Sequence, residues 1–129
     1  MKTTSLISIL LSLVTAAIFF LYTGCSSDES LFDGSRTSND TRFILNFNVL
    51  NSTETHTITL AENDIIDVVI EKSRGELDIS VVDNNEKTLY KGDNASPGQF
   101  SLTVSHSGNH KFSVTGRKAA GYVSFTLRQ

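Results

Sequence analysis

The chain has 129 residues, a net charge of −3 and one cysteine, and this length fits a single domain. No block or stripe of basic residues occurs along the sequence, which excludes nucleic acid as a partner and a polybasic segment that binds anionic lipid. A single cysteine excludes an internal disulfide, and no motif indicates a bound cofactor.

Residues 1–24 are predicted to be an export signal. Lys2 is the only charged residue before Asp28, and an apolar core over 6–21 is followed by small residues. The order Leu21-Tyr22-Thr23-Gly24-Cys25 resembles the bacterial lipobox, in which an aliphatic residue and two small residues precede an invariant cysteine. Tyr22 departs from the aliphatic residue usual at that position. The resemblance implies that the Cys25 thiol receives a diacylglycerol and that cleavage makes Cys25 the first residue of the mature protein.

An uncleaved signal anchor is the alternative, because the uncharged run over 3–27 is long enough to span a bilayer. Both interpretations place 26–129 outside the cytoplasmic membrane, at the cell surface or in the periplasm. Loss of Lys2 with the leader moves the net charge from −3 to −4. Residues 25–41 are rich in Ser, Asp and Asn and are predicted to be a lipidated, flexible tether.

From residue 42 onward, apolar residues alternate with polar ones, the pattern of half-buried strands. This pattern predicts eight strands, over 42–50, 55–60, 65–71, 76–82, 87–91, 99–105, 110–115 and 122–127. Gly, Asn, Asp and Ser are common in the connections, and no segment after the leader has helical apolar spacing. The prediction is an all-β domain over 42–129, a single antiparallel β-sandwich of jelly-roll-like form.

The second half of this domain, from GELDISVVDNNEKTLYKGDN to the final YVSFTL, resembles GOLD domains and bacterial prepeptidase C-terminal domains. The shared features are an Asx-rich turn, a short strand ending in LYK, a Phe-containing strand, and a glycine before each of the last two strands. The resemblance implies a β-sandwich with a binding or accessory role. It carries over no catalytic residues.

Two histidines are weak candidates for metal ligands. A three-residue hairpin loop over 107–109 would place His106 opposite His110 on the core-facing side of adjacent strands, with His56 on the same parity elsewhere. Zinc or copper needs three or four convergent ligands, and no cysteine or dense carboxylate cluster lies nearby. The expectation is therefore no metal site, with two histidines at the rim of the sandwich.

The ligand-binding candidates are equally weak. Tyr122 is the clearest outward aromatic residue and lies close to the cationic pair Arg117 and Lys118, while Tyr90 is a second possible contact. Sugar sites on sandwiches usually present flat aromatic platforms, and this chain has no tryptophan. Packing between strands is the ordinary role of both tyrosines.

The sequence contains no G-x-S-x-G elbow and no phosphate-binding loop, and the one thiol is expected to carry lipid, so no enzyme is predicted. The expected function is that of a membrane-anchored extracytoplasmic lipoprotein whose sandwich is a non-catalytic interaction module. Its expected partners are the membrane, through lipid on Cys25, and an envelope protein. The alternative is a lipoprotein that binds a small ligand or a glycan, and a metal-handling role is a more distant one.

Overall fold

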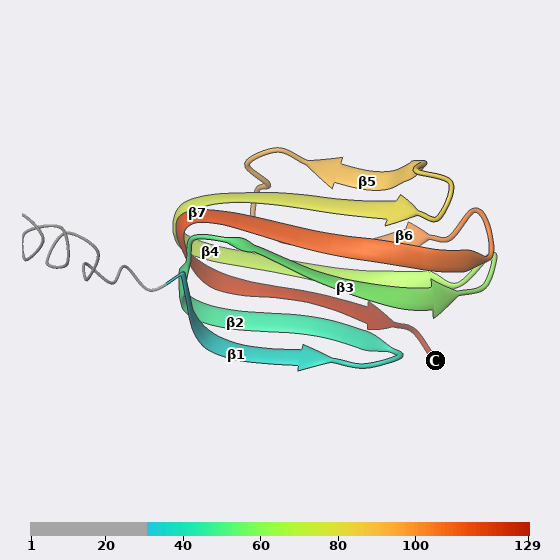
Figure 1. The fold of residues 1–129 in the computed structure, drawn as a ribbon, viewed down its shortest axis with the longest axis horizontal. Helices are drawn as coiled ribbons and strands as arrows, with labels where there is room; N and C mark the ends of the chain where they lie inside the picture. The colour runs from blue at the N-terminus through green and yellow to red at the C-terminus, as the bar shows by residue number, and fades with distance from the viewer. Residues whose placement is uncertain (1–30) are drawn as a thin grey trace, which may run out of the picture.

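The computed structural model describes residues 31–129, and every regular element in this part of the chain is a β-strand (Figure 1). No helix long and apolar enough to cross a membrane is found between residues 31 and 129. All the strand pairs are antiparallel. The strands are β1 (Phe32–Ser38), β2 (Arg42–Leu50), β3 (Thr53–Leu60), β4 (Ile65–Asp83), β5 (Thr88–Gly92), β6 (Gly98–Thr103) and β7 (Gly108–Leu127).

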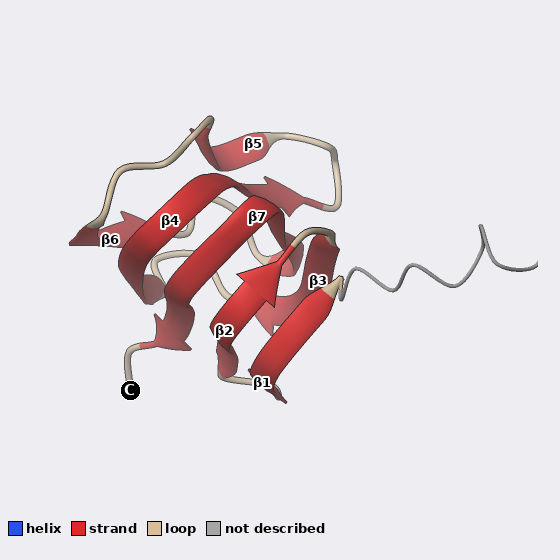
Figure 2. Cartoon of the chain, turned by 90° about the vertical axis from the view of Figure 1, so that its left-hand side faces the viewer, coloured by secondary structure: helices blue, strands red, loops and turns tan. Residues whose placement is uncertain are grey.

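The two longest strands, β4 and β7, run through both layers of the sandwich. Their outer segments, 65–72 and 121–127, pair in one layer whose order is β1-β2-β7-β4-β6. The remaining segments, 76–83 and 110–117, pair in a second layer whose order is β3-β7-β4-β5. The whole is therefore a single sheet folded over on itself, and the view in Figure 2 shows the two layers facing each other. This confirms the predicted all-β antiparallel sandwich.

The fold-over is made by two adjacent bends, one in each long strand, at the end of the sandwich that we call the bent end. The β4–β7 register shifts between Lys72 and Arg74 and again between Arg74 and Glu76. Such bulges bend a strand and increase its twist without ending it. Gly75 has φ +73, which glycine adopts without steric cost. At Gly121 a Cβ would meet the Glu71 carbonyl oxygen far inside van der Waals contact.

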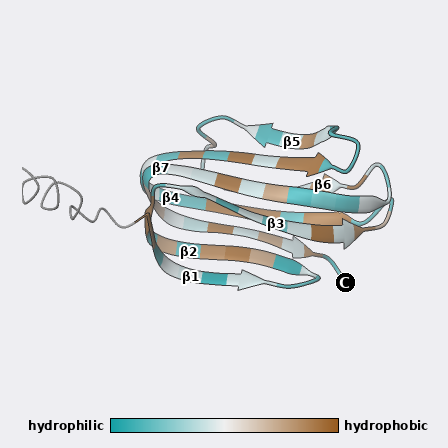
Figure 3. Ribbon diagram, in the orientation of Figure 1, coloured by the Kyte–Doolittle hydropathy of each residue, from teal (hydrophilic) through white to brown (hydrophobic). Residues whose placement is uncertain are grey.

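The core lies between the layers and follows the predicted parity. Alternate apolar residues of β2, β4 and β7 are buried, which gives the banded hydropathy seen along these strands in Figure 3. Phe112 and Phe125, both fully buried, pack with ring centroids 4.9 Å apart. Leu50 is also buried, because a register shift after Phe47 turns it inward. One apolar core thus spans both layers.

Two corrections concern the number and limits of the strands. The connections predicted between the strands over 65–71 and 76–82, and between those over 110–115 and 122–127, are bends inside continuous strands. These bends have the sequences SRGE in β4 and GRKAAG in β7, so the four predicted strands are two. The flexible tether predicted up to residue 41 is wrong over Phe32–Ser38, which forms β1 and pairs with β2. Backbone pairing, which is independent of side-chain polarity, holds this polar segment in the sheet. The predicted leader and Cys25 lie outside the described residues.

The predicted hairpin around residues 107–109 is also wrong. β6 pairs with β4 in one layer, whereas Gly108 begins the segment of β7 that pairs with β3 in the other. The connection between β6 and β7 therefore crosses from layer to layer. His110 has Ile58 and Asp83 as its strand partners, and His106 lies in the connection itself.

Candidate binding surfaces

The sandwich has four edge strands, and three of them are protected. β1, β3 and β5 each carry charged residues, which discourage pairing with another chain. Arg36 of β1 also reaches across the open side of the sandwich, where Nη2 donates to the Thr55 carbonyl oxygen at 2.6 Å and Nη1 to Glu54 at 2.6 Å. Its guanidinium lies 5.0 Å from the Phe43 ring centroid. Arg36 thus connects β1 to β3 and occupies part of the β3 edge.

The fourth edge strand, β6, has no charged residue. Its sequence is GQFSLT, and it pairs with β4 on one side only. Gln99, Ser101 and Thr103 are exposed, while Phe100 and Leu102 are half-buried. A shallow groove of about 280 Å³ runs where β6 meets β4 and is lined by Asp67, Val68, Val69, Gln99, Phe100 and Ser101. β6 therefore presents unpaired backbone groups beside partly exposed apolar side chains.

An ion pair borders this groove. Arg128 Nη2 donates to Asp67 Oδ1 at 2.5 Å, and Ser101 Oγ donates to the same oxygen at 2.9 Å. Arg128, and after it Ser101, lower the pKa of the Asp67 carboxyl below its usual range. Asp67 is therefore ionised at neutral pH and oriented by its two partners, which fixes the polar rim of the groove.

Tyr122 lies on the outward face of the five-stranded layer. Its strand partners are Asn46 on β2 and Glu71 on β4, so an amide, a phenol and a carboxylate form a row across three strands. A shallow groove of about 380 Å³ surrounds this row and is lined by Asn46, Phe47, Asn48, Glu71, Lys72, Ser73, Ala120, Gly121 and Tyr122. Such a row combines a ring face with hydrogen-bonding groups of the kind that bind polar ligands.

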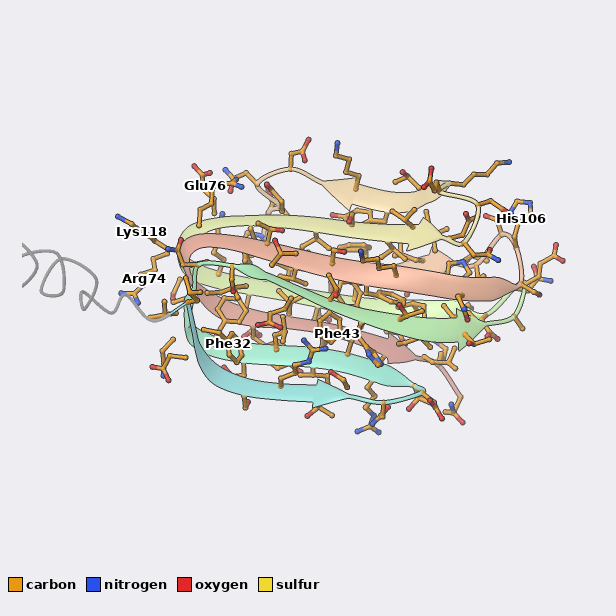
Figure 4. All side chains as sticks on the ribbon, in the orientation of Figure 1. Phe32, Phe43, Arg74, Glu76, His106 and Lys118 are labelled. Atoms are coloured by element: carbon orange, nitrogen blue, oxygen red, sulfur yellow. The ribbon has the colours of Figure 1, made fainter. Side chains whose placement is uncertain are left out.

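The other candidate ligand residues lie apart from Tyr122. Arg117 is ion-paired, with Nε 2.8 Å from Glu76 Oε2 and Nη1 2.5 Å from Asp78 Oδ2, and neither Arg117 nor Lys118 lines the Tyr122 groove. Lys118 is exposed at the tip of the bent end (Figure 4). Tyr90 packs on Phe100 with ring centroids 4.9 Å apart and closes the side of the sandwich between β5 and β6.

The ion pair between Arg117 and the carboxylates of Glu76 and Asp78 at the bent end shifts the pKa values of its members. Arg117, followed by the Asn94 backbone N–H, lowers the pKa of Asp78 from 3.8 to about 2. Asp78 and then Glu76 raise the pKa of Arg117. All three side chains are partly exposed, so the pair contributes little net stability, and its main effect is to neutralise Arg117 locally.

The three histidines differ in burial and in their hydrogen-bond partners. His110 is 2% exposed, and its Nδ1 donates to the Gly108 carbonyl oxygen at 2.9 Å. His106 is exposed on the connection, and both line a small pocket of about 100 Å³ together with Asp83. His56 lies on the neighbouring strand β3, opposite Phe112, and its Nε2 is 2.7 Å from the Asn39 carbonyl oxygen. Residues 31–129 contain no group of three or more potential metal ligands.

Asp83 illustrates how the Asx-rich turns are used. Its Oδ1 accepts hydrogen bonds from the backbone N–H groups of Asn85 and Lys87, both at 2.9 Å. Lys87 N–H makes the larger contribution to lowering the pKa of this carboxyl. The carboxylate is therefore occupied in closing the β4–β5 turn.

No protein-family model and no curated protein sequence matches the chain. Among solved structures, the chain is similar to PliG of Aeromonas hydrophila, a periplasmic inhibitor of g-type lysozyme. The two share 12% sequence identity with a TM-score of 0.48, and the match covers 73% of this chain and 89% of that chain. The prepeptidase C-terminal domain of a Bacillus anthracis collagenase has 12% identity, 78% and 100% coverage, and a TM-score of 0.47. A structure described as "CBM4 structure and function" has 10% identity, 80% and 81% coverage, and a TM-score of 0.37. These are likenesses of chain path only.

The sequence indicated some of these surface residues and missed others. Tyr122 was identified as outward by its parity, but Asn46 and Glu71 were not, because strand register decides that they flank it. The β6 edge was missed for the same reason. Its one local signal is the absence of charge in GQFSLT, which has meaning only once the strand order is known.

Proposed function

We propose that this chain is a lipid-anchored extracytoplasmic protein whose β-sandwich serves as a non-catalytic interaction module. The lipobox-like sequence ending at Cys25 supports the anchor. The observation that supports an interaction module concerns β6. It is an edge strand without charged residues, whereas the other three edge strands each contain charged residues. Natural sheets usually protect such edges, so an unprotected one is a site where another chain can pair.

An extended segment of a partner protein would add a strand beside β6. Its backbone would pair with the unpaired N–H and C=O groups of β6, and its side chains would meet Phe100 and Leu102. Asp67 is already paired with Arg128, so this rim of the groove adds no net charge and recognition would depend on the backbone and the apolar side chains. Binding of this kind needs no deep cavity and no catalytic group.

A second candidate function is the binding of a glycan or other small polar ligand in the Tyr122 groove. The row of Asn46, Tyr122 and Glu71 favours it, because a sugar ring can lie on a phenol while its hydroxyls bond to the flanking amide and carboxylate. Only one aromatic ring is present in this row. We therefore place it second to strand pairing.

Capture of partners from envelope extract by the full chain in detergent tests the module. Gln99→Lys with Thr103→Lys puts two charges on the β6 edge and should abolish capture of the partner that the wild type binds. Ser35→Lys with Thr37→Lys, on edge strand β1, is the matched control and should leave capture unchanged. Equal capture by the β6 variant would exclude strand pairing at this edge.

Two further measurements separate the parts of the proposal. Saturable binding on a glycan array that is lost in Tyr122→Ala, with empty capture experiments, would favour the second candidate. Metabolic labelling with radioactive palmitate should mark the wild type and not Cys25→Ala. Label retained by Cys25→Ala, or a free Cys25 thiol in protein isolated from membranes, would contradict the lipid anchor.

A further inference from the structure

The described chain begins at the bent end of the sandwich. Leu31 is fixed there, because its carbonyl oxygen accepts from Asn51 N–H at 2.8 Å. Asn51 follows Leu50, whose strand partner Ala119 belongs to the bend of β7. Figure 1 shows the start of β1 at this end, opposite the turns that join β1 to β2 and β4 to β5. The first residue of β1 therefore lies at the bent end, separated from the bend of β7 by Leu50 of β2.

Chain length limits which part of the domain can reach the bilayer. The six residues 26–31 separate Cys25 from Phe32. Seven residue steps span at most about 25 Å when fully extended. The opposite end lies a further strand away, and the nine residues of β2 alone extend about 30 Å. With lipid on Cys25, the bent end is the end held next to the membrane.

The bent end has the chemistry of an interfacial surface. Leu31 is 61% exposed and is the one large hydrophobic residue so exposed among the described residues. Arg74 and Lys118 are exposed and extend beyond the bends (Figure 4). Neither makes an ion pair with another described residue, although Arg74 Nη2 donates to the Asn48 carbonyl oxygen at 2.7 Å. An apolar side chain beside exposed basic groups suits the boundary between acyl chains and phosphates.

The charges of the two ends differ. Around the bends, four bases, Lys72, Arg74, Arg117 and Lys118, stand against four acids, Asp33, Glu71, Glu76 and Asp78, so this end carries no net charge. Glu76 and Asp78 both bind Arg117. The turns at the opposite end are acidic, with five acids against two bases: Asp40, Glu62, Asp64, Asp83 and Glu86 against Arg42 and Lys87. No basic run exists in the sequence, and the fold itself gathers Arg74 and Lys118 at one tip. An anionic surface therefore repels the opposite end more strongly than the bent end, where Arg74 and Lys118 form no ion pair within residues 31–129.

We propose that the bent end docks on the phosphate-bearing headgroup surface of the membrane, with Leu31 in the interface and Arg74 and Lys118 on lipid phosphates. The proposal rests on the lipid anchor of the proposed function and adds an orientation to it. The strands then stand away from the bilayer, and the β6 edge remains open from the side.

Tryptophan fluorescence tests this orientation, since the chain has no tryptophan of its own. Ser73→Trp places a probe in the β4 bend, and Asn85→Trp places one in the β4–β5 turn at the opposite end. Full-length lipidated protein is reconstituted in phosphatidylcholine vesicles containing phosphatidylglycerol and a lipid with a headgroup-level quencher. The Ser73 probe should be quenched and the Asn85 probe should not. Because both probes are the same residue, the affinity of tryptophan for interfaces does not favour either end.

Substitution of Lys118 sharpens the result. Its side chain has no hydrogen bond or ion pair within residues 31–129, so Lys118→Gln leaves the bend intact. In the Ser73→Trp background, Lys118→Gln should lower the ratio of docked to undocked domain by about fivefold on anionic vesicles. Leu31→Ser should lower it too, and Lys87→Gln, at the opposite end, should have no effect.

Equal quenching of the two probes, or stronger quenching of the Asn85 probe, would overturn the proposal. Intact mass shows whether Cys25 is acylated, so failure of the anchor is recognised separately. If the thiol is free, the same chain is coupled through Cys25 to a maleimide phospholipid in the vesicles. The quenching of the two probes then supports or overturns the orientation in the same way.

Discussion

At the bent end, β4 and β7 pass from one layer to the other without interruption, whereas at the opposite end the chain reverses through separate turns and connections. The bends are closed by backbone packing, in which glycines allow contacts too close for a side chain. The turns are closed by side chains, such as Asp83 accepting from Asn85 and Lys87. The two ends of one sandwich should therefore tolerate substitution differently, with the bent end sensitive to added volume and the turns sensitive to lost acceptors.

The largest expected effect lies in the core that joins the two ends. Phe112→Ala should lower the free energy of unfolding by about 3–5 kcal/mol, because it removes a fully buried ring in contact with Phe125. Ser113→Ala, at the next position on the strand, should change it little. Urea denaturation followed by far-ultraviolet circular dichroism measures both. A cost below about 1 kcal/mol for Phe112→Ala would show that the layers are not held by one core.

The next-largest loss of stability is expected when a glycine at the bent end, rather than one in an ordinary strand position, is replaced by alanine. Gly121→Ala should cost about 3 kcal/mol, the upper part of the range for overpacking, because the new Cβ meets the Glu71 carbonyl in the backbone itself. Gly98→Ala is the matched control, since no atom lies within 4 Å of its added Cβ. Both are measured by the same urea titration. Equal stability of the two variants would show that the bend opens easily.

The smallest effect concerns pH and the ion pair at the bend. Arg117 holds the pKa of Asp78 at about 2 in the folded protein, below its ordinary 3.8, so the pair stabilises the fold above about pH 4. That contribution is lost as the pH falls from about 4 towards about 2. The stability difference between wild type and Asp78→Asn should therefore be present at pH 7 and vanish near pH 2.

Salt distinguishes the two ends in the same measurement. The Asp78–Arg117 pair is partly exposed, so added sodium chloride should shrink the effect of Asp78→Asn at pH 7. The effect of Asp83→Asn at the β4–β5 turn should change less, because its partners are neutral backbone groups. An Asp78→Asn effect that grows on acidification would contradict the assignment of the pair.

Local pattern predicted most of the buried residues, with Leu50 and His106 as exceptions, and it did not predict where strands end. Phe112 and Val68 follow a period of two that neighbouring residues alone determine, and both are buried. The bends at SRGE and GRKAAG have the composition of turns, yet their mutual pairing keeps the ladder continuous through them. β1 is polar throughout after Phe32, so only pairing with β2 reveals it as a strand.

The candidate sites divide in the same way. The outward direction of Tyr122 follows from parity along its own strand. The residues beside it, the edge position of β6 and the gathering of Arg74 and Lys118 at one tip depend on contacts between segments far apart in the chain. The short glycine-containing segment over 107–109 predicted a hairpin by a local rule. The chain instead crosses between layers there, since β6 and β7 pair with different strands.

The position of β1 determines how the domain carries mechanical load. A pull on the N-terminus leaves the sandwich at Phe32, along the axis of β1, while β2 runs antiparallel beside it. If the proposed lipid anchor and the proposed partner both hold the protein, tension between them would slide β1 against β2. The seven residue pairs from Phe32–Leu50 to Ser38–Phe43 then resist together, because a sliding strand must break its hydrogen bonds at once rather than one after another. The hydrogen bonds from Arg36 to Glu54 and Thr55 connect β1 to β3 and also resist this sliding.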